Sequence, residues 1–270
     1  MPTISPLAAF EDNIQDAIIL VNRAKFLSTI GMRKLQSART ELVCDFLKIP
    51  KRDRGDVLCL ENDHLFFVIK KDVGFGLDEM KNADPLYRQA IVAGCAALES
   101  YVADIMIQHL DFALGLKEPS SKLTGMPITL REWHEIDSKY VQGIRGVKKI
   151  IRENIKKSAG PSSASVGYIM SMMQLTGWST KVDNERKLTN GVTTVAQLDM
   201  IANRRNVIAH SGDRGPRNTK APIDAKTVDE YLQIIKSIVE ALDKVIKTHV
   251  NDTKHKEAQK KKEARARRSK

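Results

Sequence analysis

The chain has 270 residues, of which 42% are hydrophobic and 29% are charged, so it is long enough for a sizeable core and has the composition of a soluble protein. No run of roughly 18 apolar residues and no leader with a basic and then an apolar part occurs, so we expect neither a membrane span nor export. The net charge is +11, and three scattered cysteines without metal-like spacing predict reduced thiols and a cytoplasmic protein.

Residues 1–80 predict a mostly helical extension of unknown role. A Ser-Pro start and apolar residues at helical spacing predict a helix from residue 5 to residue 30. A second helix is predicted from Met32 to Leu47, before Pro50. Residues 50–76 have the least regular pattern, and the segment HLFFVIK at 64–70 fits a short strand.

Residues 84–250 predict an all-α fold, a bundle of four to five helices. The first helix begins at an Asp-Pro pair, and the second begins at Thr129 with Glu132 as a capping box and runs to about residue 157. A shorter helix follows at 163–175, residues 176–191 are polar and predict a loop, and helices resume at 194–210 and 224–250.

Residues 251–270 predict a basic, flexible tail. They contain nine Lys or Arg and three Asp or Glu, which leaves a net charge of +5 for the rest of the chain. Such a tail raises affinity for polyanions without choosing a sequence, although a solvated end that keeps the protein soluble explains it equally well.

The helix at 194–210 carries an unusual set of polar residues. A helix turns about 100° per residue, so four polar side chains fall within an arc of about 60°: Asp199, Asn203, Asn206 and His210. Arg205 instead lies in the middle of a separate apolar arc. An unpaired buried guanidinium is very costly, so we expect this arc to meet a bound phosphate or a carboxylate such as Glu99, on the helix that begins at residue 84, or to lie at a subunit interface open to a ligand.

These residue types suit the cleavage of RNA without a metal or another cofactor. An imidazole such as His210 can move a proton to or from a ribose oxygen, and Arg205 can hold the phosphate, its long side chain reaching toward His210. Asn206 can orient the ring or bind phosphate, with Asp199 as a helper. Arg and His at this spacing also arise by chance, and a histidine that merely ends the helix is the structural alternative.

Two segments resemble HEPN domains. LDMIANRRNVIAHSGDR (198–214) is similar to their signature helix, with Arg, a polar residue, three more residues and His. YRQAIVAGCAALESYVADIM (87–106) is similar to the first core helix of the group called RiboL-PSP. The resemblance spans about residues 84–250 and does not reach residues 1–80 or the tail.

The resemblance implies a compact helical bundle with metal-independent endoribonuclease activity. Arg205 and His210 match the catalytic pair, Asn206 matches the polar position, and Asp199, Asn203 and Glu99 are supporting positions. It also implies a homodimer with a shared active site and a role in toxin–antitoxin or anti-phage defence, with an antitoxin or regulatory protein as a further partner. Members paired with a nucleotidyltransferase antitoxin often carry Tyr two residues after the His, where this chain has Gly212.

The alternative function is a non-catalytic helical module that binds nucleic acid or a partner protein. A nucleotide-binding subunit is disfavoured, because GFG at 74–76 and GIRG at 143–146 match no phosphate-binding loop. The remaining histidines have no paired spacing that would predict a metal site.

Overall fold

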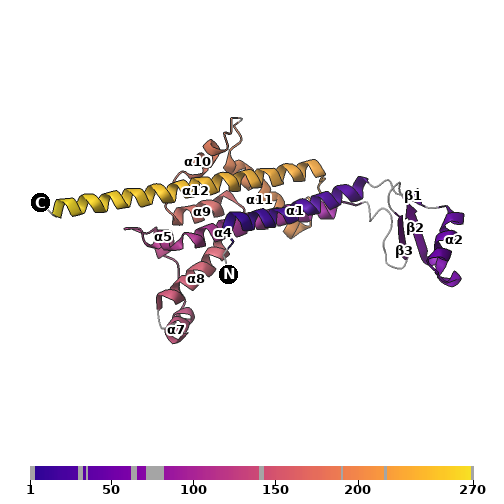
Figure 1. The fold of residues 1–270 in the computed structure, drawn as a ribbon, viewed down its shortest axis with the longest axis horizontal. Helices are drawn as coiled ribbons and strands as arrows, with labels where there is room; N and C mark the ends of the chain where they lie inside the picture. Colours follow the sequence, from indigo (N-terminus) through magenta and orange to yellow (C-terminus); the bar gives the residue numbers. More distant parts are fainter. Residues whose placement is uncertain are drawn as a thin grey trace.

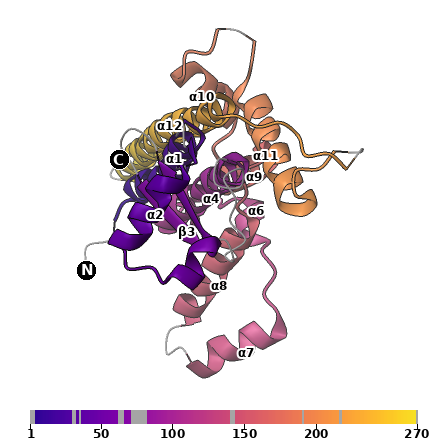
Figure 2. The same ribbon diagram turned by 90° about the vertical axis from the view of Figure 1, so that its right-hand side faces the viewer.

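The computed structural model describes residues 4–29, 33–34, 36–61, 66–70, 82–139, 143–189, 191–215 and 218–268. Three long helices run side by side along the molecule: α1 (Pro6–Thr29), α4 (Asp84–Gln108) and α12 (Ala225–Arg268) (Figure 1). Viewed along these helices, α4 lies between α1 and α12 on one side and α9 (Ser163–Met172) and α11 (Thr194–Ser211) on the other (Figure 2). The all-α bundle predicted from the sequence is confirmed.

The central helix α4 is apolar on almost all sides because other helices cover it. Among the described residues, it is the helix long and apolar enough to cross a membrane, yet thirteen of its residues are buried in the bundle. Gly94 lets α12 approach closely, since a Cβ there would lie 2.5 Å from Cδ2 of Leu232. Cys95 and Leu98 are both fully buried, and Cys95 packs in the core as a small apolar residue.

Shorter helices complete the bundle: α5 (Leu110–Leu114), α6 (Ser121–Thr124), α7 (Leu130–Lys139), α8 (Gly143–Ser158) and α10 (Trp178–Glu185). The Thr129 capping box is confirmed, because Glu132 Oε2 accepts from Thr129 N at 2.7 Å and Thr129 Oγ1 accepts from Glu132 N at 3.2 Å. The continuous helix expected after it is instead α7 and α8, with residues 140–142 outside the described part.

The N-terminal region is divided between the bundle and a small separate unit. Phe10, Ile14 and Val21 of α1 are buried in the same core as α4 and α12, so this helix belongs to the packing of the bundle. Sequence periodicity marked α1 as amphipathic but could not say which element its apolar face meets, because that partner begins 55 residues after α1 ends.

The small unit contains α2 (Ser37–Phe46), a 3-10 helix (Lys51–Asp56) and an antiparallel sheet. Its strands are β1 (Arg33–Lys34), β2 (Val57–Glu61) and β3 (Phe66–Lys70), in the order β1-β2-β3. Cys44, Val57 and Cys59 form its core, and its cysteines are free thiols, as predicted. The strand suggested at 64–70 is therefore present at Phe66–Lys70.

Two further predictions were wrong. The predicted loop at 176–191 contains α10, which offers few apolar residues of its own and is stabilised by burying Val182 against the bundle. The predicted flexible tail is a continuation of α12 to Arg268. Residues 225–268 contain no Gly or Pro and are rich in Lys, Ala, Glu and Arg, which favour helix. The end of α12 extends past the other helices (Figure 1).

Candidate active site

Helix α11 is fixed at both ends by local hydrogen bonds. Thr193 caps its start, accepting from the Ala196 amide at 3.2 Å, and Gly212 ends it in the left-handed conformation at φ +58°. The Asp213 amide then donates to the Val207 carbonyl at 3.1 Å, which closes the last turn. The buried face between these ends carries Leu198, Ile201 and Ala202 and packs inside the same chain.

Arg205 lies on this inner face, as its place in the apolar arc predicted. Its Nη2 donates to Glu99 Oε1 at 3.0 Å, and its Nη1 donates to Asn206 Oδ1 at 3.1 Å. Burial raises the pKa of Glu99, and the positive charge of Arg205 opposes that rise. The expected contact with Glu99 is therefore present, and no dimer contact is required to explain a guanidinium on this arc.

One atom of the Arg205 guanidinium is left without a partner. Within the described part of the chain, Nε is buried and makes no hydrogen bond, although the whole side chain remains 27% exposed. A buried donor without an acceptor is unusual in a folded protein. A hollow of about 280 Å³ opens beside Glu99, between α4 and α8, with Lys156 on its lining. Arg205 is thus tethered to Glu99 but not saturated with acceptors.

His210 lies near the end of α11 and is exposed. No hydrogen bond to its ring is found among the residues that the structure describes, and the same holds for the exposed Asn203. Arg205 and His210 are five positions apart, so they diverge by about 140° around the helix. The Arg205 guanidinium is bonded to Glu99 and Asn206, and no hydrogen bond joins it to His210 among the described residues, so the expectation that its tip reaches His210 stays a prediction.

Asp199 has a different task from the others in the polar stripe. Its carboxylate accepts from the Ser163 amide at 2.9 Å and from the Ser163 hydroxyl at 2.8 Å, at the first turn of α9. It therefore satisfies an otherwise free helix amide and fixes α9 against α11. The role of Asp199 is therefore structural and separate from that of His210. Asn203 and Asn206 are exposed, and helical spacing puts them on the same side of α11 as the His210 ring.

A buried ion cluster, which sequence reasoning missed, holds the segment just after α11. Asp213 is fully buried, and its Oδ2 accepts from Arg88 Nε at 2.7 Å and from Arg204 Nη2 at 2.9 Å. Arg88 also contacts Asp84 at 3.2 Å and the Ala221 carbonyl at 2.9 Å. The cluster ties the end of α11 to the start of α4, and Asp213 lies three residues after His210. In the sequence, the short spacing between Arg204 and Asp213 was the available signal for an ion pair. No local pattern indicated that Arg88 would join it.

The described residues contain no group of three or more His, Cys, Asp or Glu side chains placed to hold a metal ion. The side chains that α11 offers for chemistry are the guanidinium of Arg205, the amide of Asn206 and the imidazole of His210. A guanidinium binds phosphate oxygens through paired hydrogen bonds, and an exposed imidazole can exchange protons with a bound substrate.

Comparison with known proteins places most of the chain in one family. The sequence model described as RiboL-PSP-HEPN matches residues 69–248, a segment that starts in the small unit and ends in α12. It contains Glu99 as well as Arg205, Asn206 and His210. The comparison with curated proteins found no match. The comparison with solved structures found none either.

Proposed function

Because the chain belongs to the RiboL-PSP-HEPN family, which is associated with RNA cleavage, we propose that it is a metal-independent endoribonuclease. A ribose 2′-hydroxyl attacks the neighbouring phosphate, and the bond to the 5′-oxygen breaks. The products are a 2′,3′-cyclic phosphate and a 5′-hydroxyl end. The observation that carries the proposal is an incompletely paired guanidinium at Arg205 and an exposed imidazole at His210 on one helix, in the spacing of the family's signature.

In this proposal His210 takes the proton from the 2′-hydroxyl or gives one to the leaving 5′-oxygen. Arg205 binds the phosphate and stabilises the charge that develops on it, and Asn206, already bonded to Arg205, orients the guanidinium. Glu99 keeps Nη2 of the guanidinium paired until substrate arrives. Asn203 lies on the exposed side and is available to contact RNA.

The divergence of Arg205 and His210 within one chain supports a site shared by two copies. The exposed side of α11 carries apolar side chains beside the polar stripe, with Met200 43% exposed and Val207 40% exposed. Large apolar side chains on an outer helix face favour contact with another protein surface. A homodimer that joins two α11 helices across this side brings both copies of His210 and Asn206 into one cleft, and Arg205 is linked to that cleft through its bond to Asn206.

The test is cleavage of a defined RNA by the full chain in the presence of EDTA. We expect cleavage by the unmodified protein, cyclic phosphate ends, and a rate at least about 100-fold lower for His210→Ala, which removes the proton-transfer group. His134→Ala, at an exposed histidine on α7, is the matched control and should cleave normally. No cleavage by the unmodified protein, or equal rates for it and His210→Ala, would refute the proposal.

The alternative of a non-catalytic binding module is favoured by one observation, the neutralisation of Arg205 by Glu99 in the single chain. It requires RNA to bind equally well after His210→Ala and to stay intact with the unmodified protein. A role in toxin–antitoxin or anti-phage defence, an antitoxin partner and a cytoplasmic location stay predictions from the sequence.

A further inference from the structure

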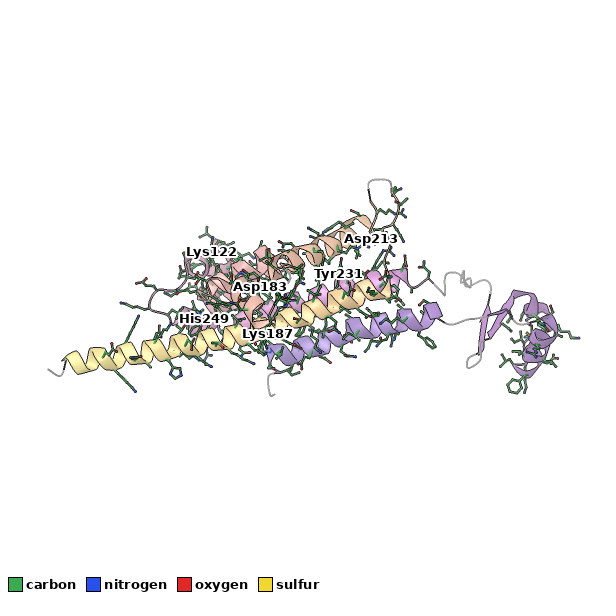
Figure 3. The ribbon with its side chains drawn as sticks, turned by 90° about the horizontal axis from the view of Figure 1, so that it is seen from above. Lys122, Asp183, Lys187, Asp213, Tyr231 and His249 are labelled. Atoms are coloured by element: carbon green, nitrogen blue, oxygen red, sulfur yellow. The ribbon has the colours of Figure 1, made fainter. Side chains whose placement is uncertain are left out.

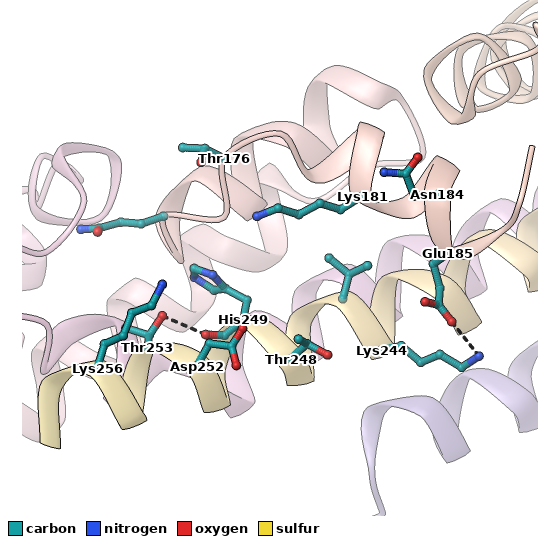
Figure 4. Close-up of a pocket in the computed structure, with 12 residues that line it drawn as sticks. Thr176, Lys181, Asn184, Glu185, Lys244, Thr248, His249, Asp252, Thr253 and Lys256 are labelled. Atoms are coloured by element: carbon teal, nitrogen blue, oxygen red, sulfur yellow. Dashed lines mark hydrogen bonds and ion pairs between the residues drawn. The ribbon is translucent and has the colours of Figure 1, made fainter. Parts of the chain in front are cut away.

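A polar groove of about 580 Å³ lies between α10 and α12, away from α11's exposed end. Figure 4 shows its two walls, with Lys181 and Asn184 on α10 facing a row of side chains on α12. Its lining is dominated by lysines and by uncharged hydrogen-bonding groups, including Thr176, Thr248 and Asn184. Such a lining suits an anionic, strongly hydrogen-bonding ligand and not an apolar one.

Two lysines point into the groove without an anionic partner. Lys181 from α10 and Lys256 from α12 project toward the His249 ring from opposite walls (Figure 4). Both are exposed, and across the described ranges neither forms an ion pair within 4.0 Å. The third lysine, Lys244, is already paired with Glu185 at 3.0 Å. The free positive charge is therefore concentrated at the end of the groove that holds Lys181 and Lys256.

The floor between these lysines is fixed in place. The Nε2 atom of His249 lies 2.9 Å from the Met173 carbonyl oxygen, and the ring packs edge-on against Phe112. Thr253 donates to the His249 carbonyl at 2.8 Å, which keeps its side chain on the helix. Among the described residues that line the groove, Asp252 and Glu185 are the carboxylates and Lys181, Lys244 and Lys256 the lysines, so this lining has a net positive charge.

The groove is elongated, which favours a polymer over a single phosphate. Lys244, Thr248, Asp252 and Lys256 form one row on α12, and the first and last of these are about 18 Å apart along the helix axis. Beyond Lys256 the same helix leaves the bundle and continues with exposed Lys260 and Lys262. Cationic side chains in such a line can follow successive phosphates of a nucleic-acid strand.

The groove is distant from the proposed cleavage site. Asp213, next to the end of α11, and His249 lie toward opposite ends of the bundle (Figure 3). Arg88 of the Asp213 cluster donates a hydrogen bond to the Ala221 carbonyl, just before α12 begins at Ala225. His249 lies 24 residues further along α12, which is about 36 Å from Ala225 along the helix axis. A strand held in the groove would not compete with the phosphate at Arg205.

We propose that the groove between α10 and α12 binds the sugar–phosphate backbone of RNA, with Lys181 and Lys256 as its phosphate contacts. The identity of the polyanion rests on the proposed ribonuclease function. The groove then serves as a second anchor that holds a long RNA while α11 acts on another part of it, and it selects for strand length and not for base sequence.

The test measures binding of fluorescent single-stranded RNA by anisotropy, with the full chain carrying His210→Ala so that the RNA survives. Each phosphate contact on a single strand contributes about 0.7 to the slope of log affinity against log salt concentration. Lys181→Ala/Lys256→Ala should therefore reduce the slope by about 1.4. Lys139→Ala/Lys149→Ala, which removes the same charge from α7 and α8, should leave the slope unchanged.

A gain-of-binding variant keeps the test decisive if the double variant folds poorly. Asp252→Lys replaces a lining carboxylate with a cation and should tighten RNA binding and steepen the salt dependence. The proposal would be overturned if the salt slope were unchanged in Lys181→Ala/Lys256→Ala or fell equally in Lys139→Ala/Lys149→Ala. It would also be overturned if Asp252→Lys did not tighten RNA binding.

Competitors distinguish the sources of phosphate. Inorganic phosphate or a mononucleotide that displaces RNA from the groove at millimolar concentration would point to a single-phosphate site and overturn the polymer assignment. A polyglutamate peptide that binds as tightly as RNA, and loses binding in the groove variant, would overturn it in favour of an acidic protein. If RNA binds in the groove but the unmodified protein cleaves no RNA, the RNA-binding groove is supported and only the proposed nuclease activity is refuted.

Discussion

The buried carboxylate of Asp213 gives the sharpest stability prediction. Asp213→Asn keeps the size of the side chain and tolerates the left-handed backbone, at φ +65°, so the change isolates the negative charge. It leaves Arg88, whose side chain is 8% exposed, without its 2.7 Å partner. Removing one member of a buried ion pair costs about 3–5 kcal/mol.

The lower part of that range applies here. In the variant Arg88 still has its ion pair with Asp84 at 3.2 Å. The side chain of Arg204 is 21% exposed, so water can solvate its guanidinium. We therefore expect a loss of about 3 kcal/mol in the free energy of unfolding, measured by urea denaturation with circular dichroism. For a protein of this size that corresponds to a melting temperature lower by about 6–12 °C.

An exposed ion pair supplies the matched control. Lys25 and Asp229 are 2.5 Å apart, closer than either arginine is to Asp213, but their side chains are 40% and 46% exposed. Asp229→Asn should therefore cost no more than about 1 kcal/mol, because water screens the pair. If Asp213→Asn falls within that same limit, burial does not set the strength of the cluster and the reasoning is wrong.

Three further predictions concern the ends of α11, the cap of α9 and the end of α4. Gly212→Ala should cost about 1 kcal/mol in the free energy of unfolding, because among the described residues beyond its chain neighbours no atom lies within 4 Å of an added Cβ, and only the φ of +58° opposes a side chain; a neutral result in urea denaturation would contradict this. Asp199→Ala should cost about 1–2 kcal/mol by freeing the Ser163 amide, while leaving the cleavage rate per folded molecule near normal; a rate loss like that of His210→Ala would make Asp199 part of the chemistry. Burial, followed by the charge of Lys254, lowers the pKa of His109, so the folded state binds fewer protons than the unfolded state and stability falls as the pH drops through about 6.5. His109→Gln should flatten the acid side of the curve of unfolding free energy against pH, and an unchanged curve would show that His109 is not responsible.

The candidate site was predictable from the sequence as a set of residues but not as an arrangement. Helical spacing placed Arg205 on the apolar arc, because positions around a helix follow from residue number alone, and the cost of an unpaired guanidinium made Glu99 a candidate partner. It could not show that Glu99 and Asn206 are the two side chains that bind the ends of the guanidinium. That pairing depends on which neighbouring helix lies closest, and neighbours are set by packing.

The sequence by itself determined the helical class, the limits of α11 and the residues available for phosphate chemistry, since these follow from local periodicity, capping and side-chain type. Only the tertiary structure decided that α1 joins the bundle, that Asp213 is clamped between Arg88 and Arg204, and that Lys181 faces Lys256 across a groove. Each of these contacts joins residues more than 70 positions apart, or depends on how a distant helix packs. No local pattern in a single chain encodes such contacts, because burial and charge pairing are settled only when the helices meet.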